Sequence, residues 1–268
     1  MRSFAISNIA WPAEADAVAL THVAALELQG VELAPAKALG GWETITFARA
    51  TDYRCRLADL GLIIPAFQAI TFGICGARLF GDPAERQRLA HHLSFVARLG
   101  RTMGARTCVF GSPVLRDPGE LSAQVAFDQA VTFFRALGPV FANENMVLGI
   151  EPNPALYGCR FVVQTEEAIA LAAAVDHPNI RIHFDVGSAI ANGDSDDTIE
   201  RGLTWTTHVH ASEIGLAPLG TSSFDHSRIS RIMDGCGYYG WVSIEMRKRE
   251  PWLKSIQSAV AFARKTYG

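Results

Sequence analysis

The feature that most limits the fold of this chain is a regular alternation of short apolar runs with longer helix-like stretches. Eight apolar runs occur, at residues 4–11, 31–35, 62–70, 106–111, 147–150, 180–187, 206–213 and 241–246. Strict alternation of strand and helix predicts a parallel sheet, because parallel neighbouring strands need a crossover that carries the chain back. Eight such units in 268 residues match the size of a closed (β/α)8 TIM barrel.

Capping residues mark the helices that separate these runs. Asp82, Pro83 and Glu85 form a helix start, with an N-cap, a proline in the first turn and an acid close behind, and this helix is predicted to reach Met103. The segment Asp117–Glu120 repeats the pattern and predicts a long helix to about residue 143. Further helices are predicted at residues 13–28, 45–60, 165–177, 197–203, 227–235 and 252–266.

Nothing in the sequence divides the chain into parts. There is no linker, low-complexity segment or block of charge, so a single domain over residues 1–268 is predicted. The alternative architecture is a doubly wound open sheet. No GxGxxG motif follows the first apolar run, so the dinucleotide-binding version of that sheet has no support.

Charge and cysteine usage narrow the range of partners. The net charge is −3 and no Lys/Arg-rich run occurs, so neither nucleic acid nor an anionic membrane is an expected partner. The five cysteines are scattered and include no CxxC pair, which is typical of a reduced, intracellular protein. No signal peptide or long apolar stretch is visible, so a cytoplasmic location is expected, and a homo-oligomer stays open.

Four residues that commonly bind metals lie at the ends of the last four apolar runs: Glu151, Asp185, His210 and Glu245. In a barrel the carboxyl ends of the strands meet at one mouth, and neighbouring strands are about 4.8 Å apart. These side chains could therefore surround one ion. Three carboxylates and one imidazole suit Mn²⁺, Mg²⁺ or Co²⁺ better than a structural zinc ion, which prefers thiolates.

The alternation of side chains along these runs supports the same site. Residues two apart share a face of a strand, and small or polar residues share the face of the four ligand candidates: Gly149, His183, His208 and Ser243. The opposite face is apolar: Leu148, Ile150, Ile182, Phe184, Val209, Val242 and Ile244. The apolar face is predicted to pack on outer helices and the polar face to line the inner mouth. His183 and His208 are expected to orient ligands or to contact substrate.

The motifs IEPNP, HFDVG, HVHASE and VSIEM resemble those of the xylose isomerase-like superfamily of sugar isomerases and epimerases. Ketose 3-epimerases, hydroxypyruvate isomerases and inosose dehydratases belong to it. The resemblance covers the C-terminal half. The N-terminal half matches only in its alternation of strand and helix segments. It implies one divalent metal ion bound by Glu151, Asp185, His210 and Glu245, with Glu151 and Glu245 acting on opposite faces of the substrate.

The expected reaction is an isomerisation or epimerisation of a small sugar, ketose, keto-polyol or keto acid. One glutamate would remove a proton beside the carbonyl to give an enediolate, and the other would return it. A dehydratase of the inosose type on the same site is the main alternative. An AP endonuclease-like phosphodiesterase would need extra histidines after the second to fourth runs, where Gln68 and Gly111 stand instead. A barrel that binds sugar without turnover is a further alternative.

The substrate-binding positions of the ketose epimerases are not kept. Ser188, Leu216 and Tyr157 stand where that group usually has His, Arg and Glu. The metal centre is therefore matched better than the substrate contacts. The residues expected to contact substrate are His183, His208, Trp11, Phe67, Tyr157, Ser188 and Glu213, with core packing the alternative for the aromatic pair Trp11 and Phe67.

Overall fold

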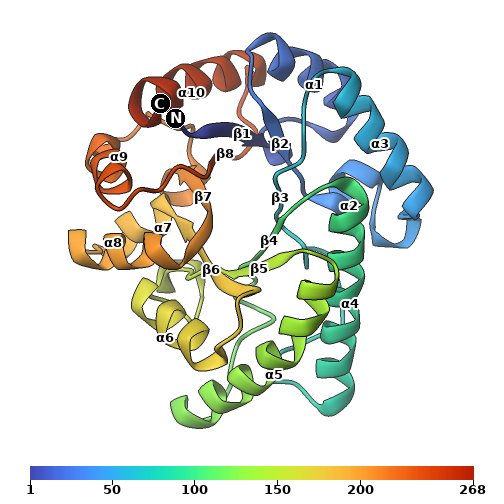
Figure 1. Cartoon of the computed structure of the whole chain (residues 1–268), viewed down its shortest axis with the longest axis vertical. Coiled ribbons are helices and arrows are strands. Elements are labelled where there is room, and N and C mark those ends of the chain that lie inside the picture. The colour runs from blue at the N-terminus through green and yellow to red at the C-terminus, as the bar shows by residue number, and fades with distance from the viewer.

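The computed structural model describes residues 1–268 as eight parallel strands in a nearly closed barrel surrounded by helices (Figure 1). The strands are β1 (Ser3–Ser7), β2 (Gly30–Glu32), β3 (Ala66–Phe67), β4 (Thr107–Phe110), β5 (Val147–Ile150), β6 (Ile180–Asp185), β7 (Thr206–Ser212) and β8 (Trp241–Glu245). They pair in the order β2-β1-β8-β7-β6-β5-β4-β3. Single bridges, Gly30 to Ile63 and Leu33 to Phe67, join the two ends of this order. The predicted (β/α)8 TIM barrel is confirmed.

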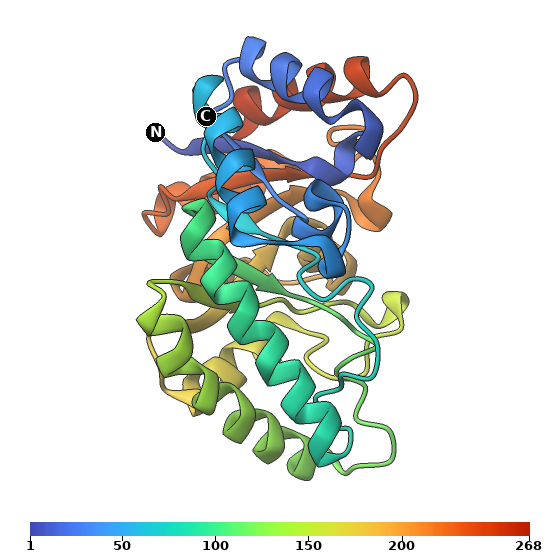
Figure 2. The ribbon, with the colours of Figure 1, turned by 90° about the vertical axis from the view of Figure 1, so that its right-hand side faces the viewer.

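Helices form the outer layer and cover the strands on all sides in Figure 1. They are α1 (Asp16–Ala25), α2 (Pro35–Leu39), α3 (Phe47–Asp59), α4 (Pro83–Met103), α5 (Ala123–Asn143), α6 (Thr165–Val175), α7 (Val186–Asn192), α8 (Asp196–Trp205), α9 (His226–Gly235) and α10 (Trp252–Tyr267). Figure 2 shows the two longest, α4 and α5, running along one side of the molecule. No helix combines the length and the apolar character that crossing a bilayer requires.

The hydrophobic core lies between the strands and the helices. All the strand residues predicted to face outward are buried, and Ile150, Ile182 and Val242 have no exposed surface. Full burial of one such side chain stabilises the fold by about 1.5–3 kcal/mol. Inside the barrel, by contrast, His183, His208 and Ser243 are buried in a polar layer. The predicted division into an apolar outer face and a polar inner face is therefore correct.

Helix α4 begins as its capping signal predicts. The backbone N–H of Glu85 donates to Asp82 Oδ1 at 2.8 Å, and the N–H of Asp82 donates to Glu85 Oε2 at 3.0 Å. These reciprocal bonds satisfy two N–H groups that a helix start leaves without partners. The helix ends at Met103, where Gly104 takes a left-handed conformation.

The similar signal at Asp117 is wrong about where the next helix starts. Helix α5 begins at Ala123, with Ser122 as its N-cap. Asp117 instead accepts a hydrogen bond from the N–H of Gly119 at 3.0 Å, which closes a local turn. Gly119 has φ +59°, a conformation incompatible with a continuing right-handed helix.

Most strands are shorter than the sequence predicts, the first and third by the most, and two α-helices lie outside the predicted set. The first strand stops at Ser7, whose side chain caps a short 3-10 helix at Asn8–Ala10. The third covers only Ala66–Phe67, because Pro65 precedes it and Ala69 turns the chain with φ +49°. The two additional helices are α2, which begins three residues after the end of β2, and α7, which follows β6 directly. Asp185 is both the last residue of β6 and the N-cap of α7.

Candidate metal centre

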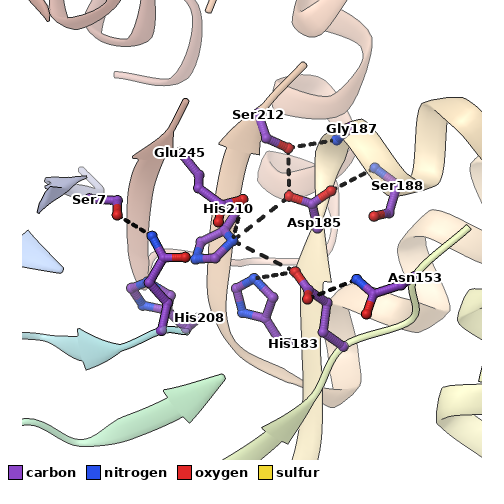
Figure 3. Close-up of polar contacts among 12 residues, drawn as sticks. Ser7, Asn153, His183, Asp185, Gly187, Ser188, His208, His210, Ser212 and Glu245 are labelled. Atoms are coloured by element: carbon purple, nitrogen blue, oxygen red, sulfur yellow. Dashed lines mark hydrogen bonds and ion pairs between the residues drawn. The ribbon is translucent and has the colours of Figure 1, made fainter. Parts of the chain in front are cut away.

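Four side chains from the neighbouring strands β5 to β8 converge at the carboxyl end of the barrel. Their ligand atoms, from Glu151, Asp185, His210 and Glu245, all lie within 4.8 Å of one another. His210 Nδ1 is 3.2 Å from Glu245 Oε2 and 3.8 Å from both Asp185 Oδ2 and Glu151 Oε1. Figure 3 shows Asp185, His210 and Glu245 pointing toward one another.

This arrangement fits a divalent cation by its own chemistry. Nδ1 of His210 is buried and makes no hydrogen bond, although three carboxylates surround it. A buried imidazole nitrogen without a partner, facing a cluster of carboxylate oxygens, is what a hard or borderline metal ion would satisfy. The sequence therefore predicts correctly which side chains come together, although β7 continues two residues beyond His210 to Ser212.

Strand register explains why these residues meet. Asp185 is paired with His210 across β6 and β7, and Glu245 is paired with Ser212 across β7 and β8. Because side chains alternate along a strand, His210 and Ser212 project to the same face. Glu151 reaches the cluster because position 111 is a glycine, where an added Cβ would lie 2.4 Å from Glu151 Oε2.

Asp185 is fixed by a small hydrogen-bond network. Its Oδ1 accepts from the N–H of Ser188 at 2.6 Å, and its Oδ2 accepts from Ser212 Oγ at 2.5 Å. Ser212 Oγ in turn accepts from the N–H of Gly187 at 2.8 Å. A Cβ at Gly187 would lie 2.9 Å from the backbone oxygen of Glu213, so glycine permits α7 to approach β7 this closely.

Glu151 is held through an amide and a buried arginine, neither of which the sequence predicts. Asn153 Nδ2 donates to Glu151 Oε2 at 2.9 Å, and the Arg116 guanidinium donates to Asn153 Oδ1 at 2.9 Å. Arg116 is 1% exposed, and its Nε and one terminal nitrogen make no hydrogen bond. The buried positive charge of Arg116 is thus linked to the candidate ligand Glu151 through the side-chain amide of Asn153.

His210 is oriented from the far side of the barrel by Glu32, which sequence reasoning missed. Oε1 of Glu32 lies 3.0 Å from His210 Nε2 and 3.4 Å from His208 Nε2, and Glu32 is fully buried on β2. A hydrogen bond from Nε2–H to this carboxylate leaves the Nδ1 lone pair free to face the other acids. The available signal was an acid inside the apolar run Val31–Pro35.

The family model described as xylose isomerase-like TIM barrel matches residues 20–266. The chain belongs to this family. No curated protein matched the chain. Among solved structures, a D-psicose 3-epimerase with D-tagatose from Clostridium cellulolyticum H10 superposes with a TM-score of 0.85 at 15% identity, covering 99% of both chains.

Two other solved structures share the fold of this xylose isomerase-like barrel. A 3-keto-D-glucoside 4-epimerase from E. coli gives a TM-score of 0.81 at 16% identity, covering 99% of this chain and 100% of the other. An AP endonuclease of family 2 from Brucella melitensis gives a TM-score of 0.78 at 16% identity and covers 99% of both chains. At these identities the likeness establishes the fold alone.

The electrostatics of the xylose isomerase-like site reflect crowded, buried acids. Burial, with the neighbouring Asp185 and Glu245, raises the pKa of Glu151 to about 8. Burial also raises the pKa of Glu245. Burial would likewise raise the pKa of Glu32, but the His210 and His208 imidazoles hold it well below its ordinary value. Mutual repulsion among the three mouth carboxylates would be relieved by a cation between them.

Two cavities meet at the acid cluster and share Glu151 and Glu245. The small cavity, of about 140 Å³, is lined by Gln68, Ala69, Ile70, Thr71, Val109, Gly111, Ser112, Glu151, His210 and Glu245. The large cavity, of about 470 Å³, is lined by Glu151, Asn153, Leu156, Tyr157, Asp185, Ser188, Glu213, Gly215, Leu216, Glu245 and Arg247. A hollow of about 670 Å³ between α4 and α5 contains none of the four ligand candidates.

The residues predicted to contact substrate divide into those that line the large cavity and those that line neither cavity. Tyr157, Ser188 and Glu213 line the large cavity. Glu213 is buried there and accepts from the N–H of Gly220 at 3.0 Å and from His226 Nε2 at 3.1 Å. It is therefore held firmly in place and is not a solvent-exposed acid.

His183 and His208 lie inside the barrel and line neither cavity. His183 Nε2 is 3.8 Å from Glu151 Oε1, which agrees with a supporting position. Trp11 and Phe67 are buried in the hydrophobic core and not at the mouth. The Trp11 indole donates to Asp16 at 2.9 Å. Successive side chains of an extended segment point in opposite directions. Gln68 lines the small cavity, so the preceding residue, Phe67, faces away from the mouth.

Proposed function

We propose that this protein is a divalent-metal-dependent epimerase or isomerase of a small sugar, ketose or related keto compound. The observation that carries the proposal is the meeting of Glu151, Asp185, His210 and Glu245 within 4.8 Å at the junction of two cavities. Structural neighbours described as ketose 3-epimerases and a 3-keto-glucoside 4-epimerase support the same reaction class.

The proposed metal ligands are Glu151, Asp185, His210 and Glu245, and Mn²⁺, Mg²⁺ or Co²⁺ suits this set of donors. When bound, such a cation would polarise the substrate carbonyl and acidify the neighbouring C–H. The protein prepares these ligands in advance. Asn153 fixes Glu151, the Ser188 N–H fixes Asp185, and Glu32 fixes His210.

Glu151 and Glu245 are the proposed acid and base. They enter the site from β5 and β8, and each lines both cavities, so a substrate lying across the junction would contact both. One carboxylate would take the proton beside the carbonyl, giving an enediolate, and the other would return a proton. Return to the opposite face of the same carbon inverts it, whereas return to the neighbouring carbon isomerises the sugar.

The polar lining of the small cavity supports a hydroxylated substrate. Gln68, Thr71 and Ser112 supply amide and hydroxyl groups beside the acid cluster. Gln68 donates to Ser7, and the hydroxyls of Thr71 and Ser112 are bonded to each other, so these groups are already fixed in position. Such an arrangement suits hydrogen bonding to sugar hydroxyls.

The test is turnover in D₂O with a panel of ketoses and keto acids, using protein loaded with Mn²⁺. Solvent deuterium at an inverted carbon is expected for an epimerase, and deuterium beside the original carbonyl for an isomerase. Loss of water along with exchange would indicate the dehydratase alternative. Products formed over many turnovers without any solvent deuterium would overturn the two-glutamate proton transfer.

A further inference from the structure

The large cavity contains one cationic side chain that has no partner on the protein. Arg247 lies two residues beyond Glu245 and contributes to the lining. Its backbone N–H donates to the oxygen of Leu216 at 2.9 Å, so the base of the side chain is anchored. No carboxylate lies within 4.0 Å of its guanidinium, although four acids line the same cavity.

Each of those acids is engaged elsewhere. Glu213 takes hydrogen bonds from His226 and Gly220, and Glu151 takes one from Asn153. Asp185 is bonded to the N–H of Ser188 and the hydroxyl of Ser212, and Glu245 lies 3.2 Å from the His210 imidazole. Arg247 is exposed and pairs with none of these carboxylates, so its five N–H donors are open to a ligand that enters the cavity.

A second donor, the hydroxyl of Tyr157, lines the same cavity as Arg247. The hydroxyl of Tyr157 accepts from the N–H of Gly215 at 2.7 Å, which leaves its own O–H free to donate. Arg247 and Tyr157 together can bind an oxygen-rich anionic group.

We propose that the substrate carries a carboxylate, bound by Arg247 and Tyr157, and is a sugar acid and not a neutral sugar. This inference rests on the proposed function. The cavity also sets the direction of binding, because the acids at the junction disfavour an anion there. The carboxylate would lie toward Arg247, and the uncharged carbonyl end would lie between Glu151 and Glu245.

A carboxylate fits these donors better than a phosphate does. A guanidinium presents parallel N–H donors that match the two oxygens of one carboxylate. Phosphate sites usually add backbone N–H groups of a glycine-rich loop or a helix start to the charged side chain. No glycine-rich loop lines the large cavity, and the one α-helix start in its lining, at Ser188, already donates its N–H to Asp185.

Calorimetric titrations with matched ligands test the inference. D-fructose and D-tagatose are compared with D-fructuronate and D-tagaturonate, which differ from them by a carboxylate in place of one hydroxymethyl group. All titrations are run with and without Mn²⁺. Charge-assisted hydrogen bonds predict that at least one acid binds about tenfold to hundredfold more tightly than its neutral partner. Arg247→Met should remove that preference and change the affinity for the neutral sugar by less than about twofold.

Arg249→Met is the matched control. Arg249 is exposed, as Arg247 is, lies two residues further along the chain and lines neither cavity. Its loss should leave the preference for the acid unchanged, and Arg247→Lys should keep only part of the preference because the fork of donors is lost. If Arg247→Met and Arg249→Met lost the preference for the acid equally, the cause would be a general effect of surface charge, and the proposed carboxylate site would be wrong.

Three further outcomes would also overturn it: equal affinity for acid and neutral sugar, failure of every acid to bind, or tighter binding of D-fructose 6-phosphate than of D-fructuronate. The last would assign the anion site to a phosphate. The proposed function fails by different readouts, namely absent Mn²⁺ binding or absent deuterium incorporation, whatever Arg247→Met does.

Discussion

The two halves of the barrel differ in both structure and chemistry. Strands β5 to β8 supply all four candidate ligands, and β6 and β7 are six and seven residues long; β7 pairs with β8 over five residues, and its pairing with β6 shifts register once, between Ile182 and Phe184. In the other half, β2 and β3 have three and two residues and are joined only by single bridges. The half that positions the chemistry is the half with the more extensive backbone pairing.

The half formed by β1 to β4, which contains the two shortest strands, nevertheless reaches the site through the interior of the barrel. Glu32 on β2 contacts His210 across the barrel, and Gln68 and Thr71 after β3 line the small cavity. The comparison indicates a division of tasks. Residues on and after β5 to β8 would bind the metal, move the proton and bind the proposed carboxylate. Residues on and after β1 to β4 would support them from across the barrel, as Glu32 does for His210, and supply polar groups to the small cavity.

The largest effect is expected in the half with the ligands. Glu151→Gln and Glu245→Gln should each lower turnover by about 10²–10⁴-fold, the usual contribution of a positioned acid or base. Steady-state kinetics should be measured together with metal content, because both residues are also proposed ligands. Glu43→Gln, at an exposed position in the other half, is the control. A Gln variant with full metal and a near-normal rate would remove that residue from proton transfer.

The second prediction compares the loss of the proposed ligand His210 with the loss of Glu32, which orients His210 from across the barrel. His210→Ala should abolish measurable Mn²⁺ binding, whereas Glu32→Gln should weaken it by about 10–100-fold, as the loss of a hydrogen bond that orients a metal ligand usually does. Titration calorimetry on folded variants, checked by circular dichroism, provides the measurement. Unchanged affinity in Glu32→Gln would contradict the supporting role assigned to the shorter half.

A smaller effect is expected from the loop contacts that fix Glu151. Asn153→Ala and Arg116→Met should each weaken Mn²⁺ binding by about tenfold, because both disturb the same chain of hydrogen bonds to Glu151. The double variant should lose little more than either single variant, since residues in one network are not additive. Additive losses would show that Arg116 acts independently of Asn153, through packing of the loop.

The sequence is most informative where a regular repeat carries the signal. Alternation at every second residue is enough to predict that Asp185, His210 and Glu245 point to the inside of the barrel, because a strand places such residues on one face. Glu32 gives no comparable pattern, since it is a single acid whose partner, His210, is 178 residues away. Arg116 could not be identified either, because its contacts depend on how a loop folds.

The errors arise where local conformation departs from the repeat. The first strand ends four residues before Trp11, so that side chain packs in the core and does not reach the mouth. The prediction for Phe67 is wrong for a different reason: Gln68, directly after the short β3, lines the small cavity, and Phe67 is buried in the core. Family positions such as Ser188 and Leu216 do lie in the large cavity, but the sequence alone does not indicate that Arg247 joins them there.

The smallest effect concerns the boundary between the two halves, where α5 connects β4 to β5. Ser122 and Asp117 each lie in a sequence that resembles a helix start, but only Ser122 Oγ accepts from a helix N–H, that of Val125 at 3.4 Å. Ser122→Ala should therefore lower the free energy of unfolding by about 1 kcal/mol, a typical value for a lost N-cap. Asp117→Ala should lower it by less than about 0.5 kcal/mol, because its contacts with Gly119 and Arg160 lie in a surface turn. Urea denaturation of both variants decides between them. Equal losses, or a larger loss for Asp117→Ala, would show that the turn at Asp117 and not the cap at Ser122 stabilises the connection between the halves.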